Sequence, residues 1–392
     1  MEQRKMAKKL DRILNYYKTK KGNLKSNNYR TISLISHPSK VLLQIVLSRL
    51  KAQAESIMAE EQAGFRARRS TTEEIPNLRI LNEKYIAHNR ELHHNFLDFT
   101  KAFDRVWHQG LWAVLRKYNI SKSLINCIES LYQDAKSAVM CEGTLSSWFN
   151  TTTGVRQGCL LSPVLFNIFL ENIMSEALQT FNGTVSVGGR NISNLRFADD
   201  IDLMAGSRKE LGELTELVDT TSAAYGMEVS TEKSKIMAIA TEKTQPEIKV
   251  RGKTLEQVES FKYLGTQITK DGRSDTEIKS RLAMATSALA KLQPLLNNKS
   301  ISIRTKIRLL RAIVISTALY GCEAWTLSAE MEKRIQAFEF RCLRRILKVP
   351  YTEHRTNVFI REEITSMMGL HDPLESVDDR KEAENAVLRA HK

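Results

Sequence analysis

Two adjacent acids, Asp199 and Asp200, are the residues in this sequence most suited to chemistry. Phe197 and Ala198 precede them and Ile201 follows, a pattern typical of two short strands joined by a tight turn. Burying an unpaired carboxylate costs several kcal/mol, so cations are expected to balance the two charges. Such acids suit Mg²⁺, which takes one or two protein carboxylates and completes its shell with water and phosphate oxygens. A solvated Asp-Asp turn is the alternative.

A third acid, Asp98, follows a short alternating stretch at residues 95–97 that predicts a strand running into a helix. If this strand and the Asp199 turn share one sheet, their carboxylates could hold two cations about 4 Å apart, the spacing that clamps the attacking and leaving oxygens in phosphoryl transfer. Residues 154–163 lie between them as a glycine-flanked polar loop, which lets backbone approach a ligand closely. A plain helix entry is the alternative for this loop.

The elements expected to position these residues include both strands and helices. Strand signals surround the three acids, and a helix is expected from about residue 162 to 178. Residues 209–225 predict a second helix, with leucines on one face and a stop at Gly226. After residue 271 the pattern changes to helices. The last of these carries an apolar stripe that predicts a packing surface, consisting of Met331, Ile335, Phe338, Cys342 and Ile346.

Seven segments, in order, resemble motifs of the reverse transcriptases of LINE-type (non-LTR) retrotransposons. The first two resemble fingers motifs, the next four resemble palm motifs, and the last resembles the hairpin that grips the primer end. Each motif is a modest signal alone, but their joint order and spacing make the resemblance specific. The segments are residues 28–34, 62–72, 96–104, 154–163, 197–200, 225–235 and 261–265.

The resemblance implies an α+β fold of the right-hand polymerase type, with fingers, an antiparallel palm sheet and a helical thumb. The expected segments are partial fingers with a basic amino-terminal part at residues 1–92, palm at 93–270, thumb at 271–350 and a carboxy-terminal tail at 351–392. The implied activity is RNA-directed DNA polymerisation, in which a DNA primer is extended on an RNA template from deoxynucleoside triphosphates. Complete elements of this type encode an upstream endonuclease, so the chain is expected to be a truncated copy.

The resemblance assigns roles to the acids and their neighbours. Asp98, Asp199 and Asp200 are implied to be catalytic and to bind two Mg²⁺ ions, for which Mn²⁺ could substitute. Lys233 matches a lysine that can protonate the leaving pyrophosphate, with a solvated strand-end lysine as the alternative. Phe103 takes the position that excludes a ribose 2′-hydroxyl and so favours deoxynucleotides. Core packing is the alternative for that ring.

Other residues are assigned to substrates. Arg30, and either Arg66 or Arg69, would meet the triphosphate through charge-assisted bidentate bonds. Gln157 and Gly158 belong to the nucleotide loop, where Gln157 would contact the minor-groove edges of the nascent base pair. The expected primer grip consists of Tyr263, Leu264 and Gly265.

Composition fits a polyanionic partner. The chain has 59 Lys and Arg against 45 Asp and Glu, a formal charge of +14 that favours nucleic acid through counterion release. The excess is concentrated in residues 1–30 and 279–348, where a solvated helix face is the alternative. No apolar stretch is long enough for a membrane span, and the amino end lacks a secretory signal. Five scattered cysteines predict reduced thiols without a disulfide partner, so an intracellular location, nuclear or cytoplasmic, is expected.

A second function remains open. The chain could be a catalytically idle nucleic-acid-binding remnant that keeps the palm but lacks the fingers support for nucleotide. The intact acids Asp98, Asp199 and Asp200 argue against this alternative, whereas truncation favours it. A structural protein with no nucleic acid partner would require every motif to be a coincidence.

Overall fold

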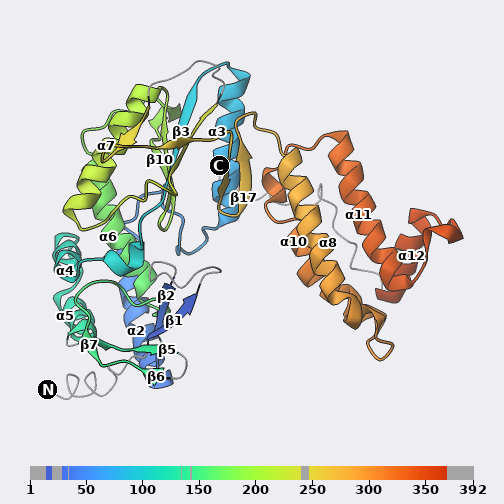
Figure 1. Cartoon of the computed structure of the whole chain (residues 1–392), viewed down its shortest axis with the longest axis horizontal. Helices are drawn as coiled ribbons and strands as arrows, with labels where there is room; N and C mark the ends of the chain where they lie inside the picture. Colours follow the sequence, from blue (N-terminus) through green and yellow to red (C-terminus); the bar gives the residue numbers. More distant parts are fainter. Residues whose placement is uncertain are drawn as a thin grey trace. The chain divides into compact units, whose positions relative to one another are not determined.

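The computed structural model describes residues 15–19, 29–33, 35–133, 135–141, 144–239 and 247–368. The chain divides into two compact units, each with its own hydrophobic core. Unit 1 comprises residues 1–71 and 89–258, and unit 2 comprises residues 72–88 and 259–392. Helices and mainly antiparallel strands occur together, which confirms the expected α+β class (Figure 1).

The main sheet of unit 1 has five strands in the order β10-β11-β3-β12-β15. Neighbouring strands are antiparallel except β12 and β15, which are parallel. The central strand β3 therefore pairs with strands that come more than one hundred residues later in the chain. The strands are β3 (Leu92–Leu97), β10 (Asn194–Phe197), β11 (Asp200–Ala205), β12 (Lys235–Ile239) and β15 (Glu256–Gln257).

Strand β3 is buried along its whole length, although its sequence contains several polar residues. Buried polar groups need partners, because an unmade hydrogen bond inside a protein is costly. His94 meets Asp202 of β11 with 2.9 Å between Nδ1 and Oδ2, and both side chains are fully buried. Asn95 donates to Thr215 Oγ1 at 2.9 Å, which links the strand to helix α7 (Arg208–Ala224). These pairs allow a polar sequence to occupy the middle of the sheet.

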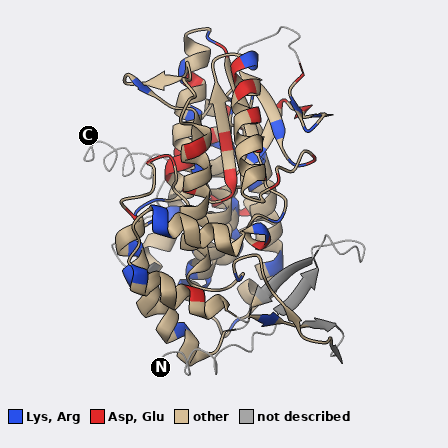
Figure 2. Ribbon diagram, turned by 90° about the vertical axis from the view of Figure 1, so that its left-hand side faces the viewer, with Lys and Arg blue, Asp and Glu red and all other residues tan. Residues whose placement is uncertain are grey.

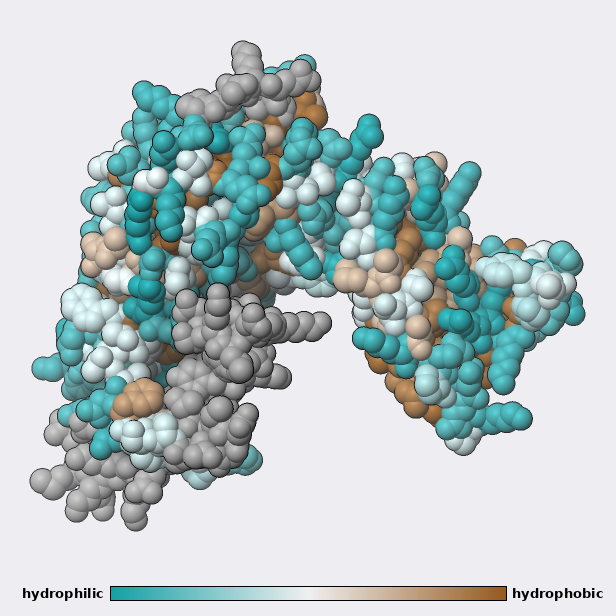
Figure 3. Space-filling view, viewed as in Figure 1, coloured by the Kyte–Doolittle hydropathy of each residue, from teal (hydrophilic) through white to brown (hydrophobic). Residues whose placement is uncertain are grey.

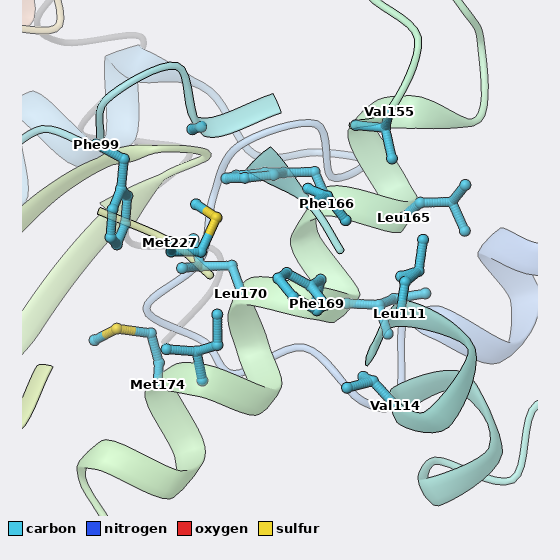
Figure 4. Packing of buried hydrophobic residues seen from close by; sticks show 14 of the residues in the cluster. Phe99, Leu111, Val114, Val155, Leu165, Phe166, Phe169, Leu170, Met174 and Met227 are labelled. Atoms are coloured by element: carbon cyan, nitrogen blue, oxygen red, sulfur yellow. The ribbon is translucent and has the colours of Figure 1, made fainter. Parts of the chain in front are cut away.

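The helices around this sheet begin where the sequence predicts. Helix α6 (Ser162–Ala177) is almost entirely buried, and the Ser162 hydroxyl donates to the Arg156 carbonyl at 2.7 Å. Helix α7 begins after Ser207, which accepts a hydrogen bond from the Glu210 backbone, and ends before Gly226, whose φ is +77°. Side chains from α6 interdigitate with those of helix α4 (His108–Lys117) and neighbouring loops (Figure 4).

A second sheet in unit 1 has four strands in the order β2-β1-β5-β6. Helices α2 and α5 complete this part of the unit, and three short strand pairs lie elsewhere in it. Both signs of charge occur along the ribbon of unit 1 (Figure 2). The remaining elements are β1 (Asn15–Thr19), β2 (Tyr29–Ser33), α2 (His37–Ala54), α5 (Lys122–Tyr132), β4 (Lys136–Ser137), β5 (Val139–Cys141), β6 (Thr144–Leu145), β7 (Phe149–Asn150), β8 (Ser186–Val187), β9 (Arg190–Asn191), β13 (Lys249–Val250) and β14 (Lys253–Thr254).

Unit 2 combines a hairpin with helices, and its chain is helical after residue 271, as expected. The five residues of the expected apolar stripe are all buried in α11. Helix α12 lies within the segment expected to be a tail and packs on α11, whereas residues 369–392 lie outside the described part of the chain. The elements are α3 (Thr71–Ala87), β16 (Ser260–Tyr263), β17 (Thr266–Thr269), α8 (Asp275–Asn297), α9 (Ile303–Leu309), the π-helical η3 (Leu310–Ile315), α10 (Ser316–Ala318), α11 (Ala329–Leu347) and α12 (Asn357–Met368).

The two units divide the chain differently from the expected fingers, palm and thumb segments. Helix α3 lies in the segment expected to form fingers and the β16-β17 hairpin in the segment expected to form palm, and both belong to unit 2. A buried arginine links the two: Arg79 of α3 donates to Ser274 Oγ at 2.8 Å and to the Gln267 carbonyl at 3.0 Å. Local sequence patterns could not predict these contacts, because the partners of Arg79 lie almost two hundred residues away.

Hydrophilic residues predominate on the face of the molecule seen in Figure 3, and hydrophobic residues form small patches among them. Among the described residues, no helix is both long and apolar enough to cross a bilayer.

Replacing a buried α6 ring should destabilise unit 1. Phe169 is fully buried, so Phe169→Ala is expected to lower the free energy of unfolding by about 3–5 kcal/mol in urea titrations. Phe149 on β7 is 46% exposed, and Phe149→Ala serves as the control, with little expected change. Equal losses in the two variants would show that α6 does not anchor the core.

Candidate functional site at the end of strands β3, β11 and β12

Strand register brings the candidate acids to one end of the main sheet. Leu97 of β3 pairs with Ile201 of β11, so the next register position sets Asp98 opposite Asp200. Phe197 pairs with Asp200 across the β10-β11 hairpin, which leaves Ala198 and Asp199 as a two-residue turn. Asp98 and the Asp199-Asp200 turn therefore lie on neighbouring strands at the same end of the sheet.

Residues just before β12 contact Asp98 at this end of the sheet. Lys233 Nζ lies 2.9 Å from Asp98 Oδ1, and Ser234 Oγ accepts the Asp98 backbone N–H at 3.1 Å. The Asp98 carbonyl accepts from Ser230 N at 2.8 Å. The Lys233 and Asp98 side chains are 58% and 36% exposed, so solvent limits the pair to at most about 1 kcal/mol of stability. Lys233 thus contacts a candidate catalytic acid directly.

The donor set fits a hard cation that takes few protein ligands. Asp98 and Asp199 are half-buried and Asp200 is exposed, so solvent and substrate oxygens can reach this edge. Mg²⁺ commonly binds through one or two carboxylates together with phosphate oxygens and water. Among the described residues, no group of three or more His, Cys, Asp and Glu side chains is gathered closely enough to hold a metal. The acids share a strand end without forming such a group, and Lys233 contacts one oxygen of Asp98.

The glycine loop lies against the segment that follows β3. Gly154 has φ of +89°, and a Cβ there would lie 2.9 Å from the Asp104 carbonyl oxygen, so a side chain would force the loop away. Gly154 N donates to Val106 O and Val155 N donates to Phe103 O, each at 2.8 Å. Nε2 of the buried His108 donates to Gly154 O at 2.7 Å. These bonds hold the loop on the turn that carries Phe103.

The next residues of the loop reach strand β2. Gly158 has φ of +96°, and a Cβ there would lie 3.2 Å from the Ser33 carbonyl oxygen. Ser33 N donates to Gln157 O at 2.8 Å. The Gln157 side chain donates to Asp104 Oδ1 at 3.0 Å. The Gln157 side-chain amide is therefore held by the Asp104 carboxylate.

Phe103 lies in the 3₁₀ turn η2 (Ala102–Arg105) and is half-buried. Its ring stacks on Phe166 of α6, with 4.6 Å between centroids and 13° between planes. The stacking agrees with the core-packing alternative. Because Phe103 is only half-buried, part of it remains accessible, as the sugar-gate prediction requires.

The arginines expected at the triphosphate differ in their surroundings. The Arg66 guanidinium bonds to Glu55 Oε1 at 2.6 Å and to the carbonyls of Ala59 and Gln62, and its side chain is 11% exposed. Arg66 could contact a triphosphate only if its guanidinium gave up these bonds. Arg69 is exposed. The Arg30 backbone lies in β2, and its side chain is outside the described part of the structure.

The expected primer-grip segment is a tight hairpin in unit 2. Leu264 and Gly265 form its two-residue turn, with φ of +46° and +86°, and Tyr263 beside them is 2% exposed. The Tyr320 hydroxyl donates to the Leu264 carbonyl at 2.9 Å. Arg281 donates to the Gly265 carbonyl, and its guanidinium lies 4.5 Å from the centroid of the Tyr320 ring. Two side chains from the following helical region therefore brace this turn.

Several residues that support the site have no clear local signal in the sequence. Arg281 and Tyr320 lie outside the recognised motifs, and each supports the Leu264-Gly265 turn through a contact made only in the folded chain. Gln62 and Ser234 belong to recognised motifs, but their contacts with Ala198 and Asp98 are not evident from residue type or spacing.

Known proteins resemble this chain over most of its length. Residues 18–268 match the family model described as reverse transcriptase (RNA-dependent DNA polymerase). A Drosophila melanogaster protein named for RNA-directed DNA polymerase activity, from transposon X-element, is 27% identical over 86% of this chain and 37% of its own length. A Pol polyprotein from retrotransposable element R2 of Popillia japonica is 27% identical over 84% of this chain and 47% of its own length. The chain thus spans less than half of these relatives.

A third relative is shorter. A transposon-derived protein of Caenorhabditis elegans is 30% identical over 50% of this chain and 71% of its own length. Among solved structures, a telomerase from Candida tropicalis, in complex with a telomeric RNA fragment, aligns with a TM-score of 0.49 and 15% identity, covering 95% of this chain and 64% of that one.

Two buried histidines, His93 and His108, should each reduce the stability of unit 1 as the pH falls below neutrality. Burial lowers the pKa of His108, although its bond to Gly154 opposes the shift, and burial also lowers the pKa of His93. Below about pH 6.5 the unfolded chain binds protons at these histidines while the folded chain resists them, so stability present above that pH is lost as the pH falls. His108→Gln, which can retain a donor for Gly154, should show a smaller loss between pH 7.5 and 5.5 in urea titrations. Identical pH slopes in the two proteins would contradict the role of His108.

Proposed function

Because the chain belongs to the reverse transcriptase (RNA-dependent DNA polymerase) family, we propose that it extends a DNA primer on an RNA template from deoxynucleoside triphosphates. The observation that carries this proposal is the register that sets Asp98 beside the Asp199-Asp200 turn. The glycine loop supports it as well, because its backbone closely approaches β2 and the Phe103 turn.

We propose that Asp98, Asp199 and Asp200 hold two Mg²⁺ ions, with Mn²⁺ as a substitute. When bound, such ions lower the pKa of the primer 3′-hydroxyl and stabilise the charge on the triphosphate. Lys233 balances the Asp98 carboxylate at 2.9 Å, and its ammonium is the proposed proton donor to the leaving pyrophosphate.

The remaining roles concern substrate placement. Phe103 is proposed to exclude the ribose 2′-hydroxyl, with its ring fixed by stacking on Phe166. Gln157 and Gly158 are proposed to line the nascent base pair, with Gln157 held by Asp104. The hairpin at Tyr263, Leu264 and Gly265 is proposed to hold the primer end. The triphosphate is assigned to Arg30 and to Arg66 or Arg69.

A nucleic-acid-binding remnant without catalysis is the second candidate function. The contact of Lys233 with Asp98 and the structural use of the Arg66 guanidinium favour it, because both groups are engaged with protein. The two candidates predict different responses to divalent metal.

Asp199→Asn should abolish both metal-linked stability and polymerisation. In the parent protein, Mg²⁺ should raise the melting temperature by mass action, and primer, template and matching nucleotide should increase the effect. Asp199→Asn should remove this stabilisation and lower extension of a DNA primer on RNA by about a hundredfold or more. Glu213→Gln is the charge-matched control, because Glu213 is an exposed acid on α7 whose side chain is 60% accessible.

Two outcomes would contradict this account in different ways. If the parent binds primer and template tightly but shows neither Mg²⁺-linked stabilisation nor extension, the binding remnant is the better description. If it extends primers on DNA templates but never on RNA, nucleotidyl transfer stands and the reverse-transcriptase proposal fails.

Phe103→Ala should admit ribonucleotides while largely preserving deoxynucleotide incorporation, since only the clash with the 2′-hydroxyl is relieved. The measurement is the incorporation ratio of the two nucleotides in single-nucleotide extension. Phe166→Ala removes the partner ring and tests for lost packing without direct removal of the gate. Unchanged discrimination in a folded Phe103→Ala protein would refute the gate, whereas unfolding of this variant would favour core packing, with a cost of about 3–5 kcal/mol.

A further inference from the structure

The turn that carries Asp199 has an unusual backbone at the preceding residue. Ala198 has φ of +60°, a left-handed conformation that alanine adopts at an energetic cost, and it is 4% exposed. Contacts around Ala198 must therefore offset this cost. Because Ala198 and Asp199 are consecutive in a two-residue turn, the backbone at Ala198 sets the direction from which the Asp199 side chain leaves the sheet.

The side chain of Gln62 makes contacts at this corner. Gln62 Oε1 accepts from the backbone N–H groups of Ala198 and Gly64, each at 2.9 Å. Gln62 Nε2 also lies 3.5 Å from the Ala198 carbonyl oxygen. Gln62 is 1% exposed, so water cannot readily replace the bonds made by its amide. One side chain thus contacts both polar backbone groups of the residue before Asp199.

The segment that presents Gln62 is itself anchored. Ala63 N donates to Arg196 O at 2.9 Å, and Arg196 N donates to Glu61 O at 2.8 Å, so the segment runs along the outer edge of β10. Asn167 of α6 donates to Gly64 O at 2.6 Å. A Cβ on Gly64 would lie 2.3 Å from Ala198 N, a distance at which the two backbones could not remain in place. Gly64 is therefore required for this close approach.

We propose that Gln62 is a positioning residue, which fixes the backbone at Ala198 and thereby directs the Asp199 carboxylate toward divalent metal. This inference rests on the proposed function of the Asp199 site and adds to it a residue that acts through the turn. A purely structural glutamine would stabilise unit 1 without a separate effect on metal binding, and this difference can be measured.

The central test compares Gln62→Met with Gln53→Met. Methionine has a similar length to glutamine but provides no amide oxygen for the Ala198 and Gly64 N–H groups. Gln53 makes the corresponding kind of bond elsewhere in unit 1, accepting from Ser121 N at 3.0 Å, and is the matched control. Mn²⁺ binding is followed by electron paramagnetic resonance, alongside melting temperature, affinity for a DNA primer annealed to RNA, and extension against metal concentration.

Gln62→Met should raise the Mn²⁺ concentration for half-saturation by about tenfold or more, the size typical for groups that orient metal ligands. Its primer-template affinity should match that of Gln53→Met. Gln62→Glu retains an oxygen acceptor and should bind Mn²⁺ more like the parent than Gln62→Met does. Gly64→Ala should weaken Mn²⁺ binding by displacing the turn directly, which keeps the proposal testable if Gln62→Met does not fold.

Unchanged Mn²⁺ binding in folded Gln62→Met and Gly64→Ala would overturn the proposal. So would a loss of stability, nucleic acid binding and metal binding in equal proportion, because that result describes a structural residue. If Gln62→Met weakens Mn²⁺ binding but the parent never extends a primer, the inference holds and the proposed polymerase function fails. If the parent extends primers and Gln62→Met retains parental Mn²⁺ dependence, the proposed polymerase function holds and the inference about Gln62 fails. A parent that neither binds Mn²⁺ nor extends primers overturns both.

Discussion

The antiparallel register between β3 and β11 is the constraint on which the candidate site depends. Side chains alternate along a strand, so a slip of one residue would move every side chain of β3 to the opposite face. The pairing of Leu97 with Ile201 is thus what sets Asp98 opposite Asp200. The buried His94-Asp202 pair holds the same register between these strands, and Asn95 fixes the face of β3 that meets α7, because each would lose its partner after a slip. Polar residues in the middle of the sheet therefore contribute to the specificity of pairing as well as to stability.

Local features of the sequence were sufficient for much of the fold. The turn at Asp199, the start of α6 and the end of α7 each depend on a few consecutive residues with strong preferences. The stripe in α11 follows from periodicity and is buried. The assignment of α3 to unit 2 could not be predicted in this way, because Arg79 finds its partners only after distant segments have met.

The candidate site was predictable at the level of residue types but not of contacts. The acids and glycines are recognisable because metal binding and close backbone approach require those residues. An arginine such as Arg66 is compatible with both phosphate binding and internal hydrogen bonds, and the sequence gives no means to distinguish the two. In the structure, its guanidinium bonds to Glu55 and two carbonyls. The amide of Gln157 is similar, since its partner Asp104 lies 53 residues away.

The strand order also has a consequence for how the chain acquires its site. Asp98 and Lys233 are 135 residues apart, and the His94-Asp202 pair spans 108 residues, so the central strand pairs only with late partners. Contacts this distant in sequence slow folding, because a long loop must close before any of them forms. A chain emerging from the ribosome would hold β3 unpaired on one side until β11 had been made and on the other side until β12 had been made. During synthesis, Asp98 would therefore lack the partners that define its place until much of unit 1 had been translated.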